Sequence, residues 1–250
     1  MLESNVKVLF PDEGDKLDQN EEFVTLVTDE GSERIRIHDY DRMYSIPGLY
    51  EAIVHERLKC DSPRMMCALL KNEIPQLEDQ NNDLRVLDFG AGNGIVGECL
   101  CNLFDCDALV GLDIIPEARD AAQRDRPEVY DDYYVTDLSN PSQKKIQDLE
   151  KWNFNALLTV AALGYGDIPT QGFINAFNLI ENGGWVAFNI KDRFVSKEDE
   201  TGYHDTLRAM MGDSLDPLQI QRYCHRLSIS GEPLNYYAVV GCKLKDVPLN

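Results

Sequence analysis

The sequence predicts an α/β fold in which helices cover both faces of a mostly parallel sheet. From Leu84 onward, short apolar runs alternate with amphipathic stretches, which is the pattern of repeated βαβ units. A glycine-rich turn follows the first of these runs. The last two runs are joined only by Gly231 to Pro233, and so short a connection permits an antiparallel hairpin but no parallel crossover. We therefore expect parallel strands followed by an antiparallel pair.

Residues 1–83 precede this pattern and are predicted to form an N-terminal extension. Residues 23–37 are typical of two short strands around a Glu-Gly-Ser turn. Apolar residues one helical turn apart predict a helix over 47–59, and Ser62 with Pro63 provides an N-cap and a first-turn proline for a second helix. The extension is thus expected to hold a hairpin and two helices.

Residues 84–250 are predicted to form the main domain. Its strands are expected at 84–89, 108–113, 133–136, 155–162 and 184–190, followed by a hairpin of 220–230 and 234–244. Helices are expected to begin at Ile95, Pro116 and Thr170, with a further one near 203–211.

The composition disfavours several classes of partner. The 250 residues carry 44 acidic and 24 basic side chains, and the net charge of −20 opposes the approach of nucleic acids and anionic membranes. No apolar run approaches the roughly 20 residues that a membrane helix needs, and the first residues lack the basic flank of a signal peptide. We expect a cytoplasmic protein. Its seven cysteines form no CxxC or CxxH pair, so no metal site is predicted and the thiols are expected to be reduced.

The glycine-rich turn is the most specific feature of the sequence. A strand ends at Asp88-Phe89 and runs into Gly90-Ala91-Gly92-Asn93-Gly94 before a helix begins. Glycines let the backbone approach a ligand closely, and a helix start offers free N–H groups. A turn with a structural role alone would not need three glycines at alternate positions. We therefore expect a ligand at this turn.

Two classes of cofactor fit the turn. Gly92 to Gly97 also reads as GxGxxG, the dinucleotide pattern. However, the Asp88 carboxylate would repel a pyrophosphate, whereas it could orient the ammonium and sulfonium groups of S-adenosylmethionine. The acidic residue therefore favours the sulfonium cofactor.

The segment Asp88-Phe89-Gly90-Ala91-Gly92-Asn93-Gly94 resembles the first motif of class I S-adenosylmethionine-dependent methyltransferases, D/E-x-G-x-G-x-G. The resemblance covers roughly residues 84–244. It implies a Rossmann-like seven-stranded sheet of order 3-2-1-4-5-7-6 with an antiparallel last strand. It also implies S-adenosylmethionine as the cofactor, bound in part by Asp88, Gly90, Ala91, Gly92, Asn93 and Gly94.

Two further acidic residues follow strand ends. Asp113, with Ile114, is placed to accept both ribose hydroxyls, although it could instead cap the helix after Pro116. Asp137, followed by Leu138, resembles the family position that binds the adenine amino group, and a turn aspartate is the alternative.

The end of the fourth strand is expected to contribute Ala161 to cofactor binding. It lacks the Asn/Asp-Pro-Pro-aromatic segment of similar enzymes that methylate base amines, which disfavours that chemistry. Tyr165 and Asp167 are candidates for the acceptor pocket because ligands bind beyond the carboxyl ends of the strands, although both could be plain loop residues. His204 is a further acceptor-side candidate.

The segment from His38 to Tyr44 resembles the Tyr-Asp-x-x-Tyr lid of small-molecule methyltransferases. This resemblance assigns Tyr40 to the cofactor and Tyr44 to the acceptor. The alternative is an aromatic pair that packs the extension onto the sheet.

The C-terminal hairpin, together with residues 155–190, is similar to the methyltransferase-like proteins named after the Williams–Beuren region. No acceptor follows from this similarity. The first motif and the net charge together predict methyl transfer to a small molecule. An NAD(P)-dependent oxidoreductase and a non-catalytic cofactor-binding module are the alternatives. No catalytic base is predicted, because in-line methyl transfer depends mainly on positioning.

Overall fold

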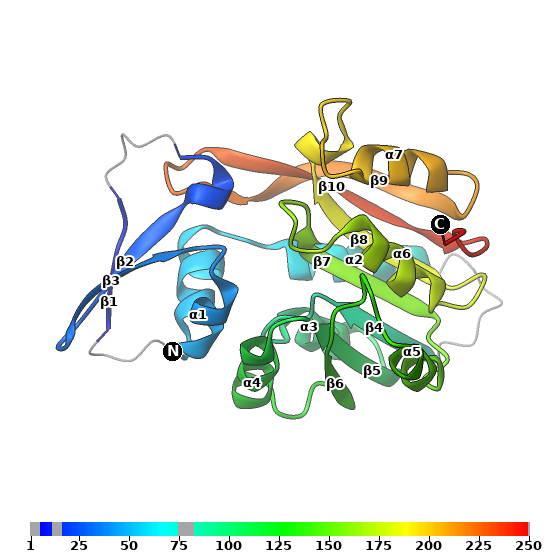
Figure 1. The fold of residues 1–250 in the computed structure, drawn as a ribbon, viewed down its shortest axis with the longest axis horizontal. Coiled ribbons are helices and arrows are strands. Elements are labelled where there is room, and N and C mark those ends of the chain that lie inside the picture. Colours follow the sequence, from blue (N-terminus) through cyan, green and yellow to red (C-terminus); the bar gives the residue numbers. More distant parts are fainter. Residues whose placement is uncertain (1–5, 12–16, 75–82, 250) are drawn as a thin grey trace.

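The computed structural model describes residues 6–11, 17–74 and 83–249, and a seven-stranded sheet runs through its centre (Figure 1). The strand order is β6-β5-β4-β7-β8-β10-β9. In chain order the strands are β4 Leu84–Phe89, β5 Cys106–Asp113, β6 Asp132–Val135, β7 Ala156–Leu163, β8 Trp185–Lys191, β9 Leu215–Leu227 and β10 Pro233–Lys243. Strands β4 to β8 are parallel, and β10 runs antiparallel between β8 and β9. This confirms the predicted order 3-2-1-4-5-7-6.

Two elements differ from the sequence prediction. β9 begins at Leu215, five residues before the expected start, because an edge strand with one exposed face needs no continuous apolar run. Helix α5, Gln143–Glu150, was not predicted. It buries only Leu149 and begins with a hydrogen bond from the Lys145 N–H to the Ser142 side chain, so it has little apolar periodicity.

Helices cover both faces of the sheet (Figure 1). Helices α2, Ser62–Glu73, and α3, Ile95–Leu103, pack Met66, Leu70 and Leu100 against one face. Helices α6, Thr170–Asn178, and α7, Tyr203–Met210, pack Phe173 and Tyr203 against the other. α2 comes before the expected boundary at residue 83, but its apolar side chains pack in the core of the main domain. The division of the chain at residue 83 stays a prediction.

The N-terminal extension is a smaller unit beside the sheet. Strands β2, Phe23–Thr28, and β3, Gly31–Arg36, form the predicted hairpin, and β1, Lys7–Leu9, adds an unexpected third strand. Helix α1, Tyr40–Ser45, and a π-helical segment, Glu51–Arg57, follow. The π-helical segment lies within the range 47–59 for which a helix was predicted, whereas α1 was not predicted. α1 packs against α4, Pro116–Asp125.

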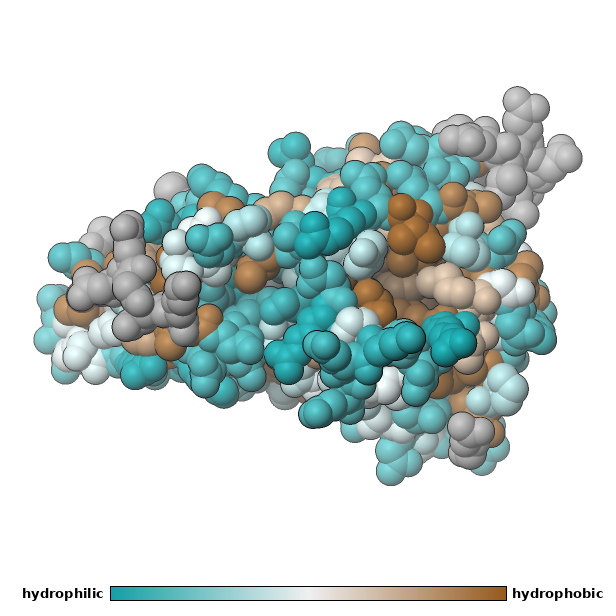
Figure 2. Space-filling model, turned by 90° about the horizontal axis from the view of Figure 1, so that it is seen from above, coloured by the Kyte–Doolittle hydropathy of each residue, from teal (hydrophilic) through white to brown (hydrophobic). Residues whose placement is uncertain are grey.

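One face of the molecule is mainly hydrophilic. Figure 2 shows one face, on which polar side chains predominate and hydrophobic ones gather toward the end opposite the three-stranded sheet. No helix in residues 6–11, 17–74 and 83–249 combines the length and hydrophobicity needed to cross a membrane.

Candidate functional site

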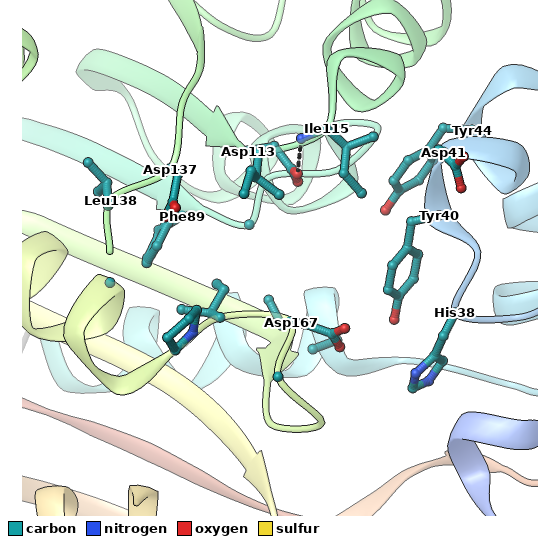
Figure 3. A pocket seen from close by; sticks show the side chains of 18 of the residues that line it. His38, Tyr40, Asp41, Tyr44, Phe89, Asp113, Ile115, Asp137, Leu138 and Asp167 are labelled. Carbon is teal, nitrogen blue, oxygen red and sulfur yellow. Dashed lines mark hydrogen bonds between the residues drawn. The ribbon is translucent and has the colours of Figure 1, made fainter. Parts of the chain in front are cut away.

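A cavity of about 470 Å³ lies at the carboxyl ends of the parallel strands, between the sheet and the segment around α1 (Figure 3). This is where ligands bind in open α/β sheets, and the volume suits one small organic ligand. The sheet side contributes Phe89, Gly90, Asp113, Ile114, Ile115, Thr136, Asp137, Leu138, Val160, Ala161, Ala162, Gly166, Asp167, Ile168, Pro169 and Gly172. The N-terminal side contributes His38, Asp39, Tyr40, Asp41, Tyr44 and Tyr50.

Gly90, the first residue of the glycine-rich turn, lines this cavity. Gly90, Gly92 and Gly94 have φ values of 79°, 53° and 86°, a left-handed conformation that side chains rarely adopt. A Cβ on Gly90 would lie 2.6 Å from the Cβ of Ala162, and one on Gly92 would overlap the Tyr44 hydroxyl. The glycines are therefore required by both conformation and space.

Asp113 connects the turn to the end of β5. Its Oδ2 accepts a hydrogen bond from the Gly92 N–H at 3.0 Å, and its Oδ1 accepts one from the Ile115 N–H at 3.0 Å. Burial raises the pKa of this carboxyl, which is 9% exposed and faces the cavity. Asp113 therefore has both a structural role and a free side toward a ligand.

Asp137 lies at the opposite end of the cavity from Tyr40, beside Leu138 and Phe89 (Figure 3). Its two oxygens accept hydrogen bonds from the Ser139 N–H at 2.7 Å and from the Ser139 hydroxyl at 2.8 Å. The turn role considered from the sequence is thus present, and the residue still lines the cavity.

Ala161 lies where β7 leaves its regular pairing with β8. Its φ is 59°, and the strand register shifts between Thr159 and Leu163. The Ala161 N–H, displaced from the ladder, donates to Oδ1 of buried Asn189 at 2.6 Å. Asn189 in turn donates to the Tyr223 hydroxyl at 2.6 Å. A buried polar network therefore shapes this part of the wall.

The opposite wall is aromatic. Tyr40 stacks on His38 and on Tyr44, with ring centroids 5.5 and 6.0 Å apart, and Tyr44 lies 5.0 Å from Tyr50. Burial raises the pKa of Tyr40 well above 10 and lowers that of His38 to about 4. The imidazole and the phenol are therefore both neutral near pH 7.

An ion-pair network fastens this wall to the glycine turn. Nη1 of Arg126 donates to Oε1 of Glu51 at 2.7 Å and to the Asn93 carbonyl at 3.2 Å. Nδ2 of Asn93 also donates to Oε1 of Glu51, at 3.1 Å. Arg124 donates to the Tyr44 carbonyl at 3.1 Å. Contacts between distant segments therefore place Tyr44 over the turn.

Asp88 does not lie where the sequence argument placed it. The side chain is fully buried behind the turn, where it accepts a hydrogen bond from the Tyr130 hydroxyl at 2.7 Å. Burial raises its pKa to about 7. Because it does not line the cavity, its position provides no direct contact with a cofactor's ammonium or sulfonium group. The rest of the turn likewise does not line the cavity, namely Ala91, Gly92, Asn93 and Gly94.

Two acceptor-side candidates also lie elsewhere. Tyr165 packs edge-on against Phe194, receives a hydrogen bond from Lys191 and lines a chamber of about 30 Å³ next to the main cavity. His204 lies on α7, where its Nδ1 donates to the Val195 carbonyl at 2.9 Å, so its position corrects the expectation that it lines the acceptor pocket. Asp167 does line the main cavity, as expected.

Comparisons with known proteins agree with this architecture. No protein-family model matches the chain. It is 26% identical over 136 residues to "Ubiquinone biosynthesis O-methyltransferase, mitochondrial" from Candida albicans, a match over 51% of this chain and only 41% of the relative. The N-methyltransferase NodS from Bradyrhizobium japonicum, in complex with S-adenosyl-L-homocysteine, superimposes with a TM-score of 0.54 at 12% identity, over 83% of this chain and 97% of NodS.

An S-adenosylmethionine-dependent methyltransferase from Anabaena variabilis gives a TM-score of 0.53 at 12% identity, over 84% of this chain and 96% of that one. The strand order, the antiparallel β10 and these superpositions agree. The chain has the class I methyltransferase fold. Placement in the Williams–Beuren subgroup stays a prediction.

In this methyltransferase fold, several cavity residues were not predicted from the sequence. His38, Tyr50 and Phe89 line the cavity, and Asn189 supports its wall. The sequence contains one indication of the role of Asn189, because it is a polar residue within the otherwise apolar part of the strand Trp185–Lys191. Among the described residues no group of three histidine, cysteine or acidic side chains could hold a metal ion, and all seven cysteines are free.

Proposed function

We propose that this protein binds S-adenosylmethionine and transfers its methyl group to a small-molecule acceptor. The observation that carries the proposal is the meeting of the Gly90 turn with the Asp113 carboxylate at one cavity of a methyltransferase fold. The Candida albicans relative, whose name includes ubiquinone biosynthesis, supports a small-molecule acceptor.

The residues present fit this cofactor. Gly90 lines the cavity, so a ligand can lie against the backbone of the turn, and the carboxylate of Asp113 retains acceptor capacity for ribose hydroxyls. Asp137 and Leu138 lie at the far end, where an adenine would be accommodated. We assign cofactor binding to Gly90, Asp113, Ile114, Asp137, Leu138, Ala161 and Tyr40.

The bound cofactor would supply a methyl group already activated by its sulfonium. The protein's own residues need then only bind, orient and exclude water. Tyr40, Tyr44 and Tyr50 close the side of the cavity opposite the sheet and can hold an acceptor in one orientation. Orientation alone can contribute several kcal/mol to such a reaction.

The charges of the cavity disfavour a nicotinamide dinucleotide. Five aspartates line it, namely Asp39, Asp41, Asp113, Asp137 and Asp167, and no lysine or arginine is among the described lining residues. A pyrophosphate would meet like charges there. The net charge of −20 likewise supports a small molecule over a nucleic acid as acceptor.

Calorimetry tests the cofactor. We expect S-adenosylmethionine and S-adenosylhomocysteine to bind at micromolar or tighter affinity and NADH to give no heat. Binding of NADH alone would contradict the proposal and favour an oxidoreductase. If S-adenosylmethionine binds but no methyl group is transferred to any fraction of a metabolite extract, a non-catalytic cofactor-binding module would be favoured.

Labelled S-adenosylmethionine tests the acceptor class. We expect label in the small-metabolite fraction and not in RNA, DNA or protein. Label found chiefly in nucleic acid would overturn the argument from charge.

A further inference from the structure

The end of the cavity formed by His38, Tyr40 and Asp167 indicates what kind of acceptor the protein takes. Resting on the proposed function, we propose that the acceptor is an amine that binds as an ammonium ion between the Asp167 carboxylate and the rings of Tyr40 and His38. Figure 3 shows these three side chains gathered at one end, away from Asp137 and Leu138.

Asp167 is a carboxylate without a counter-charge. It follows β7, lies on the loop that returns to α6, and is accessible from the open cavity. No side chain in the described parts of the chain forms an ion pair or hydrogen bond with its oxygens. The protein atoms around it and the nearby Asp113 raise its pKa to about 6, so it is still ionised above neutral pH. A ligand cation would supply the missing partner.

The nearby basic groups do not supply that partner. His38 is kept neutral because burial, together with Arg226, Arg36 and Lys191, lowers its pKa to about 4. Arg226 is 3% exposed and holds Glu22 through a 2.6 Å ion pair. Lys191 donates to the Tyr165 hydroxyl outside the main cavity. The acceptor end of the cavity is therefore negative.

The walls beside Asp167 suit an organic cation. The rings of His38 and Tyr40 stack 5.5 Å apart and Tyr44 continues the stack, so the faces of Tyr40 are largely occupied. Figure 3 shows the Tyr40 hydroxyl pointing toward the end of the cavity that holds Asp167. A phenol oxygen can accept a hydrogen bond from an ammonium N–H. The net charge of −20 also favours the approach of cations over that of anions.

Other acceptor chemistries fit this end less well. A carboxylate acceptor would meet the like charges of Asp167 and the nearby Asp113. A neutral phenol or alcohol would leave Asp167 partly desolvated and unpaired, which costs binding free energy. An ammonium offers both a positive charge and N–H donors.

An ammonium must lose one proton before its nitrogen can accept a methyl group. The N–H bond breaks, the electron pair stays on nitrogen, and the proton passes to a carboxylate oxygen of Asp167. The carboxylic acid can then release it to water through the open cavity. The raised pKa of this carboxyl makes it a better proton acceptor than an ordinary aspartate.

Binding of three matched probes tests this inference without any turnover. Protein saturated with S-adenosylhomocysteine is titrated at pH 7.5 with 2-phenylethylamine, 2-phenylethanol and phenylacetate. We expect the amine to bind at least tenfold more tightly than the alcohol, and phenylacetate to bind most weakly. Asp167→Asn should remove the preference for the amine, whereas Asp107→Asn, an exposed change at the start of β5, should preserve it.

The outcomes separate this inference from the proposed function. If S-adenosylhomocysteine does not bind the unmodified protein, the proposed function fails. If it binds but the amine shows no preference over the alcohol, only the acceptor class is overturned. If Asp167→Asn weakens the binding of S-adenosylhomocysteine as much as the binding of the amine, the carboxylate binds the cofactor's own ammonium group. The inference is then also overturned.

Discussion

The two sides of the cavity are built in opposite ways. On the sheet side, short-range backbone geometry positions Gly90, Asp113 and Asp137, each at or within two residues of the carboxyl end of a parallel strand. On the N-terminal side, Tyr40 and Tyr44 come from a separate unit, and contacts such as that between Glu51 and Arg126 position them. Most of the residues that we propose for the cofactor therefore belong to the sheet, whereas the position of Tyr40 and Tyr44 depends on contacts between two units.

The largest effect is expected from Gly90→Ala on the sheet side. The left-handed backbone would be strained by about 1–3 kcal/mol, and the new methyl would overlap Ala162. We expect no measurable binding of S-adenosylhomocysteine by calorimetry. Gly212→Ala is the control, because its φ of 76° is similar but the space around it is open. Equal loss of binding in both variants would show a general loss of stability instead.

A smaller effect is expected from Asp113→Ala, also on the sheet side. Because hydrogen bonds to a charged acceptor are lost, the binding free energy of S-adenosylhomocysteine should become less favourable by about 1.5–3 kcal/mol. Because two backbone N–H groups also lose their acceptor, Tm without ligand should fall as well. Calorimetry and thermal melting measure the two changes. A lower Tm with unchanged affinity would leave Asp113 with a purely structural role.

On the N-terminal side, Arg126→Gln should loosen the wall and leave the sheet intact. The arginine side chain is 10% exposed and forms ion pairs with both Glu51 and Glu98. We therefore expect the free energy of unfolding to fall by about 1–2 kcal/mol, a value between those of surface and buried ion pairs. Amide exchange should become faster over residues 40–57 and stay unchanged in β4. Arg119→Gln, which removes only an exposed pair with Asp120, is the control. Unchanged exchange over 40–57 would mean that the wall is held by packing.

In the unaltered protein, S-adenosylhomocysteine should slow amide exchange over residues 38–50 if this wall acts as a lid. Protection confined to Gly90 to Gly94 would identify Tyr40 and Tyr44 as packing residues.

A further effect concerns pH and the buried carboxyl of Asp88. Its pKa is raised to about 7, so the folded protein binds a proton that the unfolded chain has already lost between about pH 4 and pH 7. This group therefore contributes stability at low pH that is lost as the pH rises through that range. Asp88→Asn should reduce the difference in Tm between pH 5 and pH 8 by a few degrees. An unchanged difference would contradict the assignment.

The sheet side could be predicted because its signals are local. The glycines at 90, 92 and 94 need a left-handed backbone, and Asp113 and Asp137 follow apolar runs that end at the same edge of the sheet. The direction of the Asp88 side chain could not be predicted, because its burial depends on Tyr130, which is 42 residues away in the chain. His204 was misplaced for a different reason, because a contact only nine residues away, with the Val195 carbonyl, holds its ring on α7.

The sequence by itself determined the α/β class, the closing hairpin and the glycine-rich turn. These depend on periodicity, on glycine conformation and on the length of connections, all of which act over a few residues. The order of the strands was implied by the resemblance to class I methyltransferases and not by local signals. Only the tertiary structure decided that Tyr40, Tyr44 and His38 face Asp167 across a cavity, and that Asn189 supports Ala161. Those contacts join segments far apart in the chain, and their geometry depends on how the N-terminal unit packs on α4 and the glycine turn.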